Sequence, residues 1–333
     1  MVSVDSKAGE TTAAPGAATS APPVYAGEII DAHCHIASSK FIPEAFYEGF
    51  CRNVLVKLEA TGVKKTLGSV LDTYLTQSQD HLGDALIAEM DSAGIHRAVA
   101  LLPDFTFVMK SEFTIAEMFR LHAEILQRHA ERLFVFGGVD PRWGADGIAL
   151  FEKGVTEYGF KGFKLYPPCG YSPSDRSLYP FYEICRKHKL PVLLHIGPTS
   201  PSLEFAYSHP YLIDRAALDF PDVNFILAHG AVHFVEDCAA LCAYRPNVYL
   251  DISAFLGSSH PGGWQAGLAE LFRKNINHKI LFGTDWPVFR YSGGHRKVMD
   301  AFLAANGPLG RVSAVQRQWL MSQNIRRLLG QNS

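Results

Sequence analysis

The feature that most constrains the fold of this chain is a short apolar segment that recurs along it, each time ending in a polar or glycine-rich turn. These segments are nearly continuous in Val, Ile, Leu and Phe, as expected for parallel strands buried on both faces. We interpret eight of them as strands, at residues 28–33, 97–103, 133–139, 160–166, 191–196, 224–229, 248–253 and 279–284.

Stretches with apolar residues at helical spacing separate these strands. They cover residues 112–129, 178–188, 210–220, 232–244, 265–274 and 295–305, and a terminal helix is expected at 313–329. Strand and helix therefore alternate at intervals that fit strand–helix–strand units of about 30 residues. This alternation predicts an α/β protein with a (β/α)8 TIM barrel.

Two segments depart from this rhythm. The connection between the first and second strands, about residues 36–95, contains helical patterns at 46–60 and 81–93. So long a connection is usually functional, and we keep two interpretations of this helical insertion: a lid over the site, or an element that stabilises the side of the barrel. Residues 1–26 are rich in Ala, Thr, Ser, Pro and Gly and predict a disordered leader. One barrel domain is thus expected over residues 27–333.

Charge and composition exclude several classes of protein. The 31 lysines and arginines nearly balance the 33 aspartates and glutamates, so no basic surface for nucleic acid is expected. No apolar stretch reaches the roughly 18 residues that a membrane-spanning helix needs. The six cysteines contain no C-x-x-C pair, which favours free thiols. We expect a soluble cytoplasmic protein without membrane partners, and exposed apolar residues of the insertion would allow a homodimer.

Polar side chains end four of the strands, and the active site of such a barrel lies at these carboxyl ends. His33 and His35 end the first strand and should face the same side, because side chains alternate along a strand. His195, His229 and Asp285 end the fifth, sixth and eighth.

Strand parity predicts that these last three point into the barrel mouth. By that parity His195 shares a face with Leu193, His229 shares a face with Leu227, and Asp285 shares a face with Gly283. Four histidines and a carboxylate in matching positions are hard to explain as independent packing events.

Three nitrogens and one oxygen in an open arrangement suit Zn²⁺, with Mn²⁺, Fe²⁺ or Co²⁺ as alternatives. Such an ion would lower the pKa of a bound water towards about 7. Asp285 would orient that water and take its proton, and His229 would polarise the substrate or act as an acid.

Residues 28–330 resemble the amidohydrolase superfamily, and within it the amidohydrolase-related (amidohydrolase 2) group that includes enzymes similar to aminocarboxymuconate-semialdehyde decarboxylase. The matching segments are DAHCHI, LLHIG, ILAHG, LFGTDWP and the terminal NIRRLLG. The resemblance implies a metal-dependent barrel with His33, His35, His195 and Asp285 as ligands. It implies that His229 is catalytic or a ligand of a second metal.

Lys164 lies near the end of the fourth strand, where binuclear members of the superfamily carry a carboxylated lysine that bridges two metals. We favour a single metal, in which case Lys164 orders the substrate or a neighbouring carboxylate. Tyr166 shares its face and is expected to reach the substrate. Arg52 and Arg290 lie on segments that could overhang the mouth and bind an anionic small molecule.

Further polar groups at strand ends have two open roles. Asp31, Asp140, Asp251 and Ser253 would either hold imidazole tautomers in place or cap turns.

Three functions follow from these residues. The first is hydrolysis of a small cyclic amide, ester or lactone by metal-activated water. The second is non-oxidative decarboxylation of an aromatic or unsaturated carboxylic acid. The third is a catalytically inactive barrel that acts as a binding protein.

Overall fold

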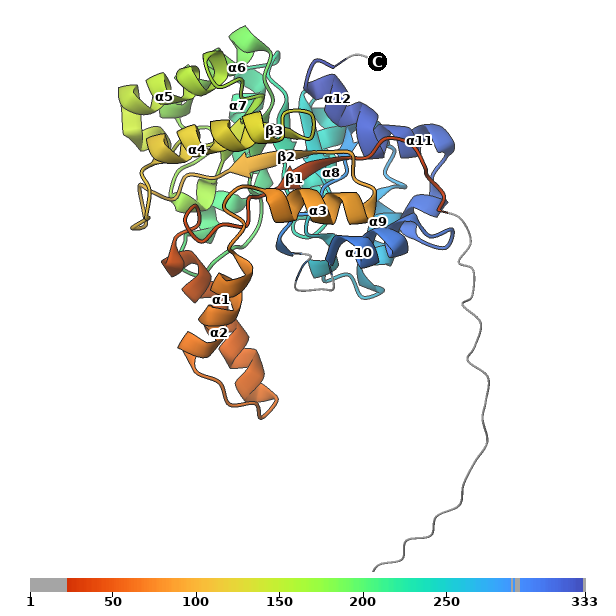
Figure 1. The fold of residues 1–333 in the computed structure, drawn as a ribbon. Coiled ribbons are helices and arrows are strands. Elements are labelled where there is room, and N and C mark those ends of the chain that lie inside the picture. The colour runs from red at the N-terminus through yellow and green to blue at the C-terminus, as the bar shows by residue number, and fades with distance from the viewer. Residues whose placement is uncertain (1–22, 289, 291–293, 332–333) are drawn as a thin grey trace, which may run out of the picture.

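The structure is a computed structural model that describes residues 23–331 except residues 289 and 291–293. The predicted leader, residues 1–26, therefore lies mostly outside the described residues. The strands run parallel and pair in the order β1 to β8, and helices surround them (Figure 1). The prediction of a (β/α)8 barrel is confirmed. The strands are β1 Ile30–Cys34, β2 Arg97–Leu102, β3 Leu133–Gly137, β4 Gly162–Leu165, β5 Val192–Leu194, β6 Phe225–Leu227, β7 Val248–Asp251 and β8 Ile280–Leu281.

The described α-helices mostly form a layer around the strands. They are α1 Glu44–Ala60, α2 Leu67–Gln77, α3 Asp84–Ala93, α4 Ile115–Arg128, α5 Gly144–Thr156, α6 Tyr179–His188, α7 Asp214–Asp219, α8 Val235–Tyr244, α9 Gly263–Leu271, α10 Gly294–Leu303, α11 Ala314–Gln318 and α12 Asn324–Leu328. A π-helical turn, Trp319–Gln323, joins α11 to α12. None of the helices within the described residues has the length and apolar character needed to cross a bilayer.

The strands divide the core into two layers. Alternate strand residues such as Val99 and Leu193 form a cluster inside the barrel, which Ile325 and Leu328 of α12 join. Their neighbours in the strands pack outward against the helices. This two-sided burial explains the continuous apolar runs in the sequence.

The last strand closes the barrel against the first one. The amide of Ala32 donates to the carbonyl of Phe282, and the amide of His35 donates to the carbonyl of Trp286. These contacts bring the residues after β8 beside those after β1, and they set the polar ends of both strands next to each other.

Three helices fill the connection between β1 and β2. The last of them, α3, packs beside α10 on the barrel wall, whereas α1 and α2 project from the barrel as a hairpin (Figure 1). The base of the hairpin rests on the loop after β5, where the hydroxyl of Ser200 donates to the carbonyl of Phe46 at 2.8 Å. Gly49 permits this approach, because a Cβ there would lie 2.1 Å from the Ser200 oxygen.

Candidate active site

The first strand aims two histidines into the barrel mouth. The register of β1 against β2 shifts between Asp31 and Cys34, and such a bulge redirects the side chains that follow it. Cys34 packs in the outer core, while His33 Nε2 and His35 Nε2 each lie 3.4 Å from the same oxygen of Asp285. The predicted common orientation of the two histidines agrees with this geometry.

The second nitrogen of each of these rings faces an oxygen that can only accept a hydrogen bond. His33 Nδ1 lies 2.8 Å from a carboxylate oxygen of Asp251, and His35 Nδ1 lies 3.0 Å from the carbonyl of Leu101. Both Nδ1 atoms therefore carry the proton in the neutral ring, and both Nε2 atoms present a lone pair. His33 Nε2 is buried and has no hydrogen-bond partner among the described residues.

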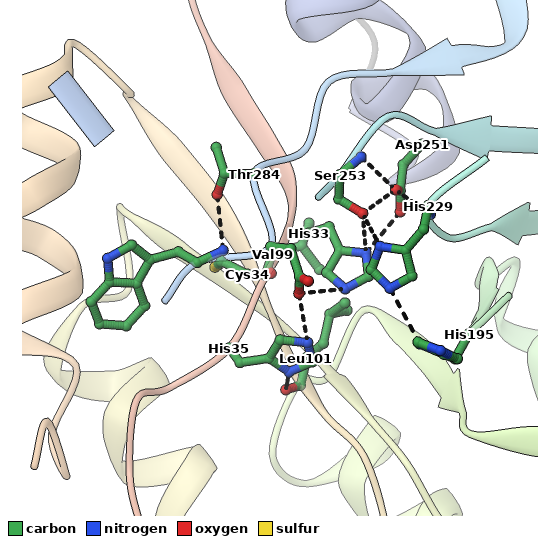
Figure 2. Close-up of polar contacts among 12 residues, drawn as sticks. His33, Cys34, His35, Val99, Leu101, His195, His229, Asp251, Ser253 and Thr284 are labelled. Carbon is green, nitrogen blue, oxygen red and sulfur yellow. Dashed lines mark hydrogen bonds and ion pairs between the residues drawn. The ribbon is translucent and has the colours of Figure 1, made fainter. Parts of the chain in front are cut away.

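His195 and His229 extend the same pattern across the mouth (Figure 2). His195 Nε2 lies 3.1 Å from the carbonyl of Gly197, so it donates, and His195 Nδ1 presents a lone pair. That Nδ1 lies 3.2 Å from His229 Nε2. His229 has a left-handed backbone, with φ of 59°, which is uncommon for a residue with a side chain.

This set of donors fits a divalent cation. His33, His35 and Asp285 offer ligand atoms that all lie within 4.8 Å of one another. Imidazole nitrogens and a carboxylate suit Zn²⁺ and related ions, and the unpartnered lone pair of His33 Nε2 needs an electrophile in the same place. His195 lies outside this group of three, so its role as a fourth ligand stays a prediction.

Burial and neighbouring charges keep the His33 ring neutral and the Asp285 carboxylate ionised. Burial, followed by the charges of Lys164 and His229, holds the pKa of His33 well below its ordinary value. Burial would raise the pKa of Asp285, but His229, His35 and His33 lower it to about 2. At neutral pH the rings of His33 and His229 are therefore neutral and Asp285 is ionised, as ligands and a base must be.

A pocket of about 350 Å³ opens above this cluster. His35, His195, His229 and Asp285 lie among its lining residues. Apolar and aromatic side chains from several elements form most of the remaining wall: Ile42, Phe46, Tyr47, Phe50, Tyr74, Phe105, Tyr166, Val232 and Val288. None of the described lining residues is a lysine or an arginine. The pocket is thus polar around the histidines and apolar elsewhere.

Comparison with known proteins identifies the family. A family model described as Amidohydrolase matches residues 30–331, which is nearly the whole described chain. The chain belongs to the amidohydrolase family. This membership and the histidine cluster agree with the resemblance drawn from the sequence motifs.

Individual relatives of this amidohydrolase are distant. A 2-keto-4-carboxy-3-hexenedioate hydratase from Sphingobium sp. is 32% identical over 100 residues, which are 25% of this chain and 29% of the hydratase. The match thus spans less than a third of that relative. The structure of 2,6-dihydroxybenzoate decarboxylase from Rhizobium has a TM-score of 0.63 at 16% identity, with 91% of this chain and 98% of the other covered.

A second solved structure contains a metal. It is a 5-carboxyvanillate decarboxylase from Novosphingobium aromaticivorans with bound manganese, at a TM-score of 0.58 and 15% identity, covering 91% of this chain and 97% of the other. At these identities the similarity of both solved structures establishes the barrel fold. The family and the donor set together support a divalent metal in this amidohydrolase.

Lys164 and Tyr166 lie beside the cluster. The Lys164 side chain is 1% exposed, and its Nζ has no hydrogen-bond partner among the described residues. Burial lowers the pKa of Lys164 to about 8, although Asp251 and Asp285 partly oppose this. Tyr166 lines the pocket and stacks on His195 with ring centroids 4.5 Å apart. The predictions that Lys164 and Tyr166 contact the substrate remain to be tested.

The structure does not bring Arg52 and Arg290 to the pocket. Arg52 is exposed on α1 and lies 3.7 Å from Glu48 one helical turn away. Arg290 forms an ion pair with Glu89 at 2.8 Å and donates to the carbonyl of Gln77. Both guanidinium groups therefore have partners away from the pocket lining. For Arg290 these partners are distant in sequence, so its direction could not be predicted.

Sequence reasoning missed the residues that shape the pocket wall. Phe46 and Phe50 belong to the connection after β1, and Phe105 lies in the loop after β2. Thr199 hydrogen-bonds the hydroxyl of Tyr166 from the loop after β5. A short aromatic series at helical spacing in the insertion was the available signal for the first two, whereas nothing in the sequence distinguishes Phe105 or Thr199 from ordinary loop residues.

Proposed function

We propose that this amidohydrolase is a metal-dependent decarboxylase of a small aromatic or unsaturated acid. The observation that carries the proposal is the pocket, which is aromatic and apolar except around the histidines and Asp285. Its volume of about 350 Å³ suits a ligand with a single ring. Decarboxylases with this fold, including one with bound manganese, support it.

The chain's own residues supply orientation and proton transfer. When bound by His33, His35, His195 and Asp285, a divalent cation would hold the acidic end of the substrate and stabilise negative charge. The apolar wall excludes water from the ring and the leaving CO₂. As the bond to the carboxylate breaks, its electron pair stays on the ring carbon. His229 or Asp285, unprotonated at the atom that faces the pocket, first takes the proton of the substrate's acid group and then delivers it to that carbon in place of CO₂.

Hydrolysis of a small lactone, cyclic amide or ester is the second candidate. It is favoured by the ionised state of Asp285 and by the absence of lysine and arginine among the described lining residues, because both suit water activation and a neutral substrate. Hydration of a tricarboxylate, which the name of the Sphingobium relative indicates for that protein, is less compatible with this pocket, since extra carboxylates need cationic partners.

Product analysis distinguishes these reactions. Protein loaded with Zn²⁺ or with Mn²⁺ is incubated with a panel of hydroxybenzoates and a panel of aromatic lactones in water enriched in ¹⁸O and deuterium. We expect release of CO₂, deuterium at the vacated ring carbon and no ¹⁸O in the product. Incorporation of ¹⁸O with opening of a lactone would establish hydrolysis instead. His33→Ala serves as the control for a contaminating enzyme.

A further inference from the structure

The two rings of His33 and His229 meet at one hydroxyl group. Ser253 Oγ lies 2.8 Å from His229 Nδ1 and 3.1 Å from His33 Nδ1, and it also contacts Asp251 Oδ1 (Figure 2). Ser253 and Asp251 are fully buried. Asp251 Oδ1 further accepts the amides of His229 at 3.0 Å and Ser253 at 2.9 Å. Every contact of this carboxylate is therefore with a donor.

The direction of each hydrogen bond follows from this arrangement. A carboxylate only accepts, so the single proton of the Ser253 hydroxyl points to Asp251. The Ser253 oxygen is then left with lone pairs, and the ring nitrogen that faces it must donate. His229 Nδ1 consequently carries a proton, and in the neutral ring His229 Nε2 does not.

We infer that Ser253 is a positioning residue that holds His229 in the Nδ1–H tautomer, so that Nε2 is the nitrogen that exchanges protons with the substrate in the pocket. The inference rests on the proposed function only in treating His229 as the proton-transferring group. His229 lines the pocket, and its Nε2 faces His195, which lines the same pocket. Ser253 is not among the residues that line the pocket, so it acts through His229.

Removal of the hydroxyl should change the tautomer and the rate together. In Ser253→Ala no oxygen remains opposite His229 Nδ1, and the ring can place its proton on Nε2 instead. Acid–base groups contribute roughly 10² to 10⁴ in rate, so we expect kcat to fall about 10²-fold for whichever hydroxybenzoate or lactone the protein turns over. KM should stay within about threefold, since the pocket wall is unchanged.

Two further variants separate the hydroxyl from packing. Ser253→Thr keeps the hydroxyl and adds one methyl group, at a position that the absent side chain of Gly283 borders. This variant should recover most of the rate. Ser208→Ala is the matched control, because Ser208 is buried and its hydroxyl donates to the carbonyl of Phe205 without touching a histidine. It should keep normal turnover.

Nitrogen NMR of zinc-loaded, ¹⁵N-histidine-labelled protein tests the tautomer without turnover. The His229 signals are those lost in His229→Gln. We expect the Nδ1–H pattern in the wild type and in Ser253→Thr, and a loss of this pattern in Ser253→Ala, with equal zinc content in all three. An unchanged His229 pattern in Ser253→Ala would overturn the inference, as would a Ser253→Thr variant as slow as Ser253→Ala.

The two proposals fail in different ways. Suppose that the wild type neither decarboxylates nor hydrolyses any compound of the two panels, while the tautomer of His229 depends on Ser253. The proposed function is then wrong and the assignment of Ser253 stands. If the wild type turns over a substrate and the tautomer does not depend on Ser253, only the assignment of Ser253 is wrong.

Discussion

At the scale of single residues, the histidine cluster places unprotonated ring nitrogens close together, without a hydrogen-bond donor for each. His33 Nε2 has no hydrogen-bond partner among the described residues, and His195 Nδ1 lies 3.2 Å from His229 Nε2. A buried polar atom left unpaired costs about 1–3 kcal/mol. The metal-free protein therefore carries a penalty that a bound cation would remove, and metal binding should stabilise the fold as well as supply chemistry.

His33→Ala should lose the metal. The variant removes one of three ligand groups that lie within 4.8 Å of one another. We expect metal analysis to give about one equivalent of zinc in the wild type and a small fraction of it in the variant. Zinc should raise the thermal midpoint of the wild type alone. His260→Ala is the control, because His260 pairs with Glu270 away from the site. Equal zinc in His33→Ala would refute the site.

His122 should make the protein less stable as the pH falls. Burial lowers its pKa from 6.5 to about 4, partly offset by the bond to the Met118 carbonyl. Between these values the unfolded chain binds a proton that the folded chain does not, so stability decreases as pH drops through the unfolded pKa and levels off below the folded one.

Urea unfolding at pH 7 and pH 5 measures this effect. The shift of His122 corresponds to a loss of about 2 kcal/mol between the two pH values. His122→Phe has no titrating group at this position. Its free energy of unfolding should therefore fall less between pH 7 and pH 5 than that of the wild type, by about the same amount. The same pH dependence in both proteins would show that His122 does not titrate as its burial implies.

His229 shows both how far sequence reasoning reaches at this scale and where it fails. The residue was expected in the mouth because it shares parity with Leu227, yet Leu227 packs in the outer core. Strict alternation would place His229 outside the barrel as well. Its left-handed backbone, φ 59°, turns the side chain inward instead. The sequence could predict a histidine at the end of this strand, but it could not predict the backbone conformation that directs the side chain inward.

At the scale of elements, the helices that sequence reasoning missed are α2 and α5. Within α5, Gly144, Gly147 and Gly154 weaken the helical pattern, since glycine is a poor helix former. Packing requires two of them: a Cβ at Gly154 would lie 2.8 Å from the ring of Phe119. A Cβ at Gly147 would lie 2.8 Å from the Cβ of Trp143. Tertiary contact thus overrides local propensity here. The strands could be predicted because burial on both faces requires a nearly continuous run of apolar residues in the sequence.

Gly49→Ala should loosen α1 from the barrel. Its new Cβ would lie 2.1 Å from Ser200 Oγ and would displace the hydroxyl that binds the Phe46 carbonyl. We expect a loss of about 1–3 kcal/mol in the free energy of unfolding. The loss should shrink in a Ser200→Ala background, because the two sites are in contact.

Gly68→Ala is the matched control for this substitution. Gly68 lies in α2, and a Cβ there meets nothing within 4 Å. Alanine in an open helical position should be neutral or stabilise by up to about 1 kcal/mol. Equal destabilisation by the two alanines would show that the contact between Gly49 and Ser200 carries no energy.

At the scale of the whole molecule, the end of the chain closes the barrel at the face opposite the site. Ile325 and Leu328 join the cluster inside the barrel. Asn324 donates to the carbonyl of Asn277 at 2.9 Å and to that of Ile280 at 2.7 Å, which ties α12 to β8. The terminal motif NIRRLLG therefore seals the interior that the strands leave open at this end.

Ile325→Ala should accordingly destabilise the whole barrel. The side chain is 1% exposed, and truncation of such a residue costs about 2–5 kcal/mol. Chemical denaturation should show one transition at lower denaturant with zinc content kept. Val315→Ala, at a residue that is 53% exposed on α11, should change stability by less than about 0.5 kcal/mol. If Ile325→Ala behaved like this control, the seal would contribute nothing.

The hairpin of α1 and α2 has a consequence for how such a protein changes over time. Metal donors come from strand ends, whereas Phe46, Phe50 and Tyr74 of the pocket wall come from the hairpin. Substitutions in the hairpin can therefore alter which molecules enter while the histidines keep their geometry. Selection or engineering can therefore change ligand preference through substitutions in this segment, while the residues at the strand ends keep the same reaction chemistry.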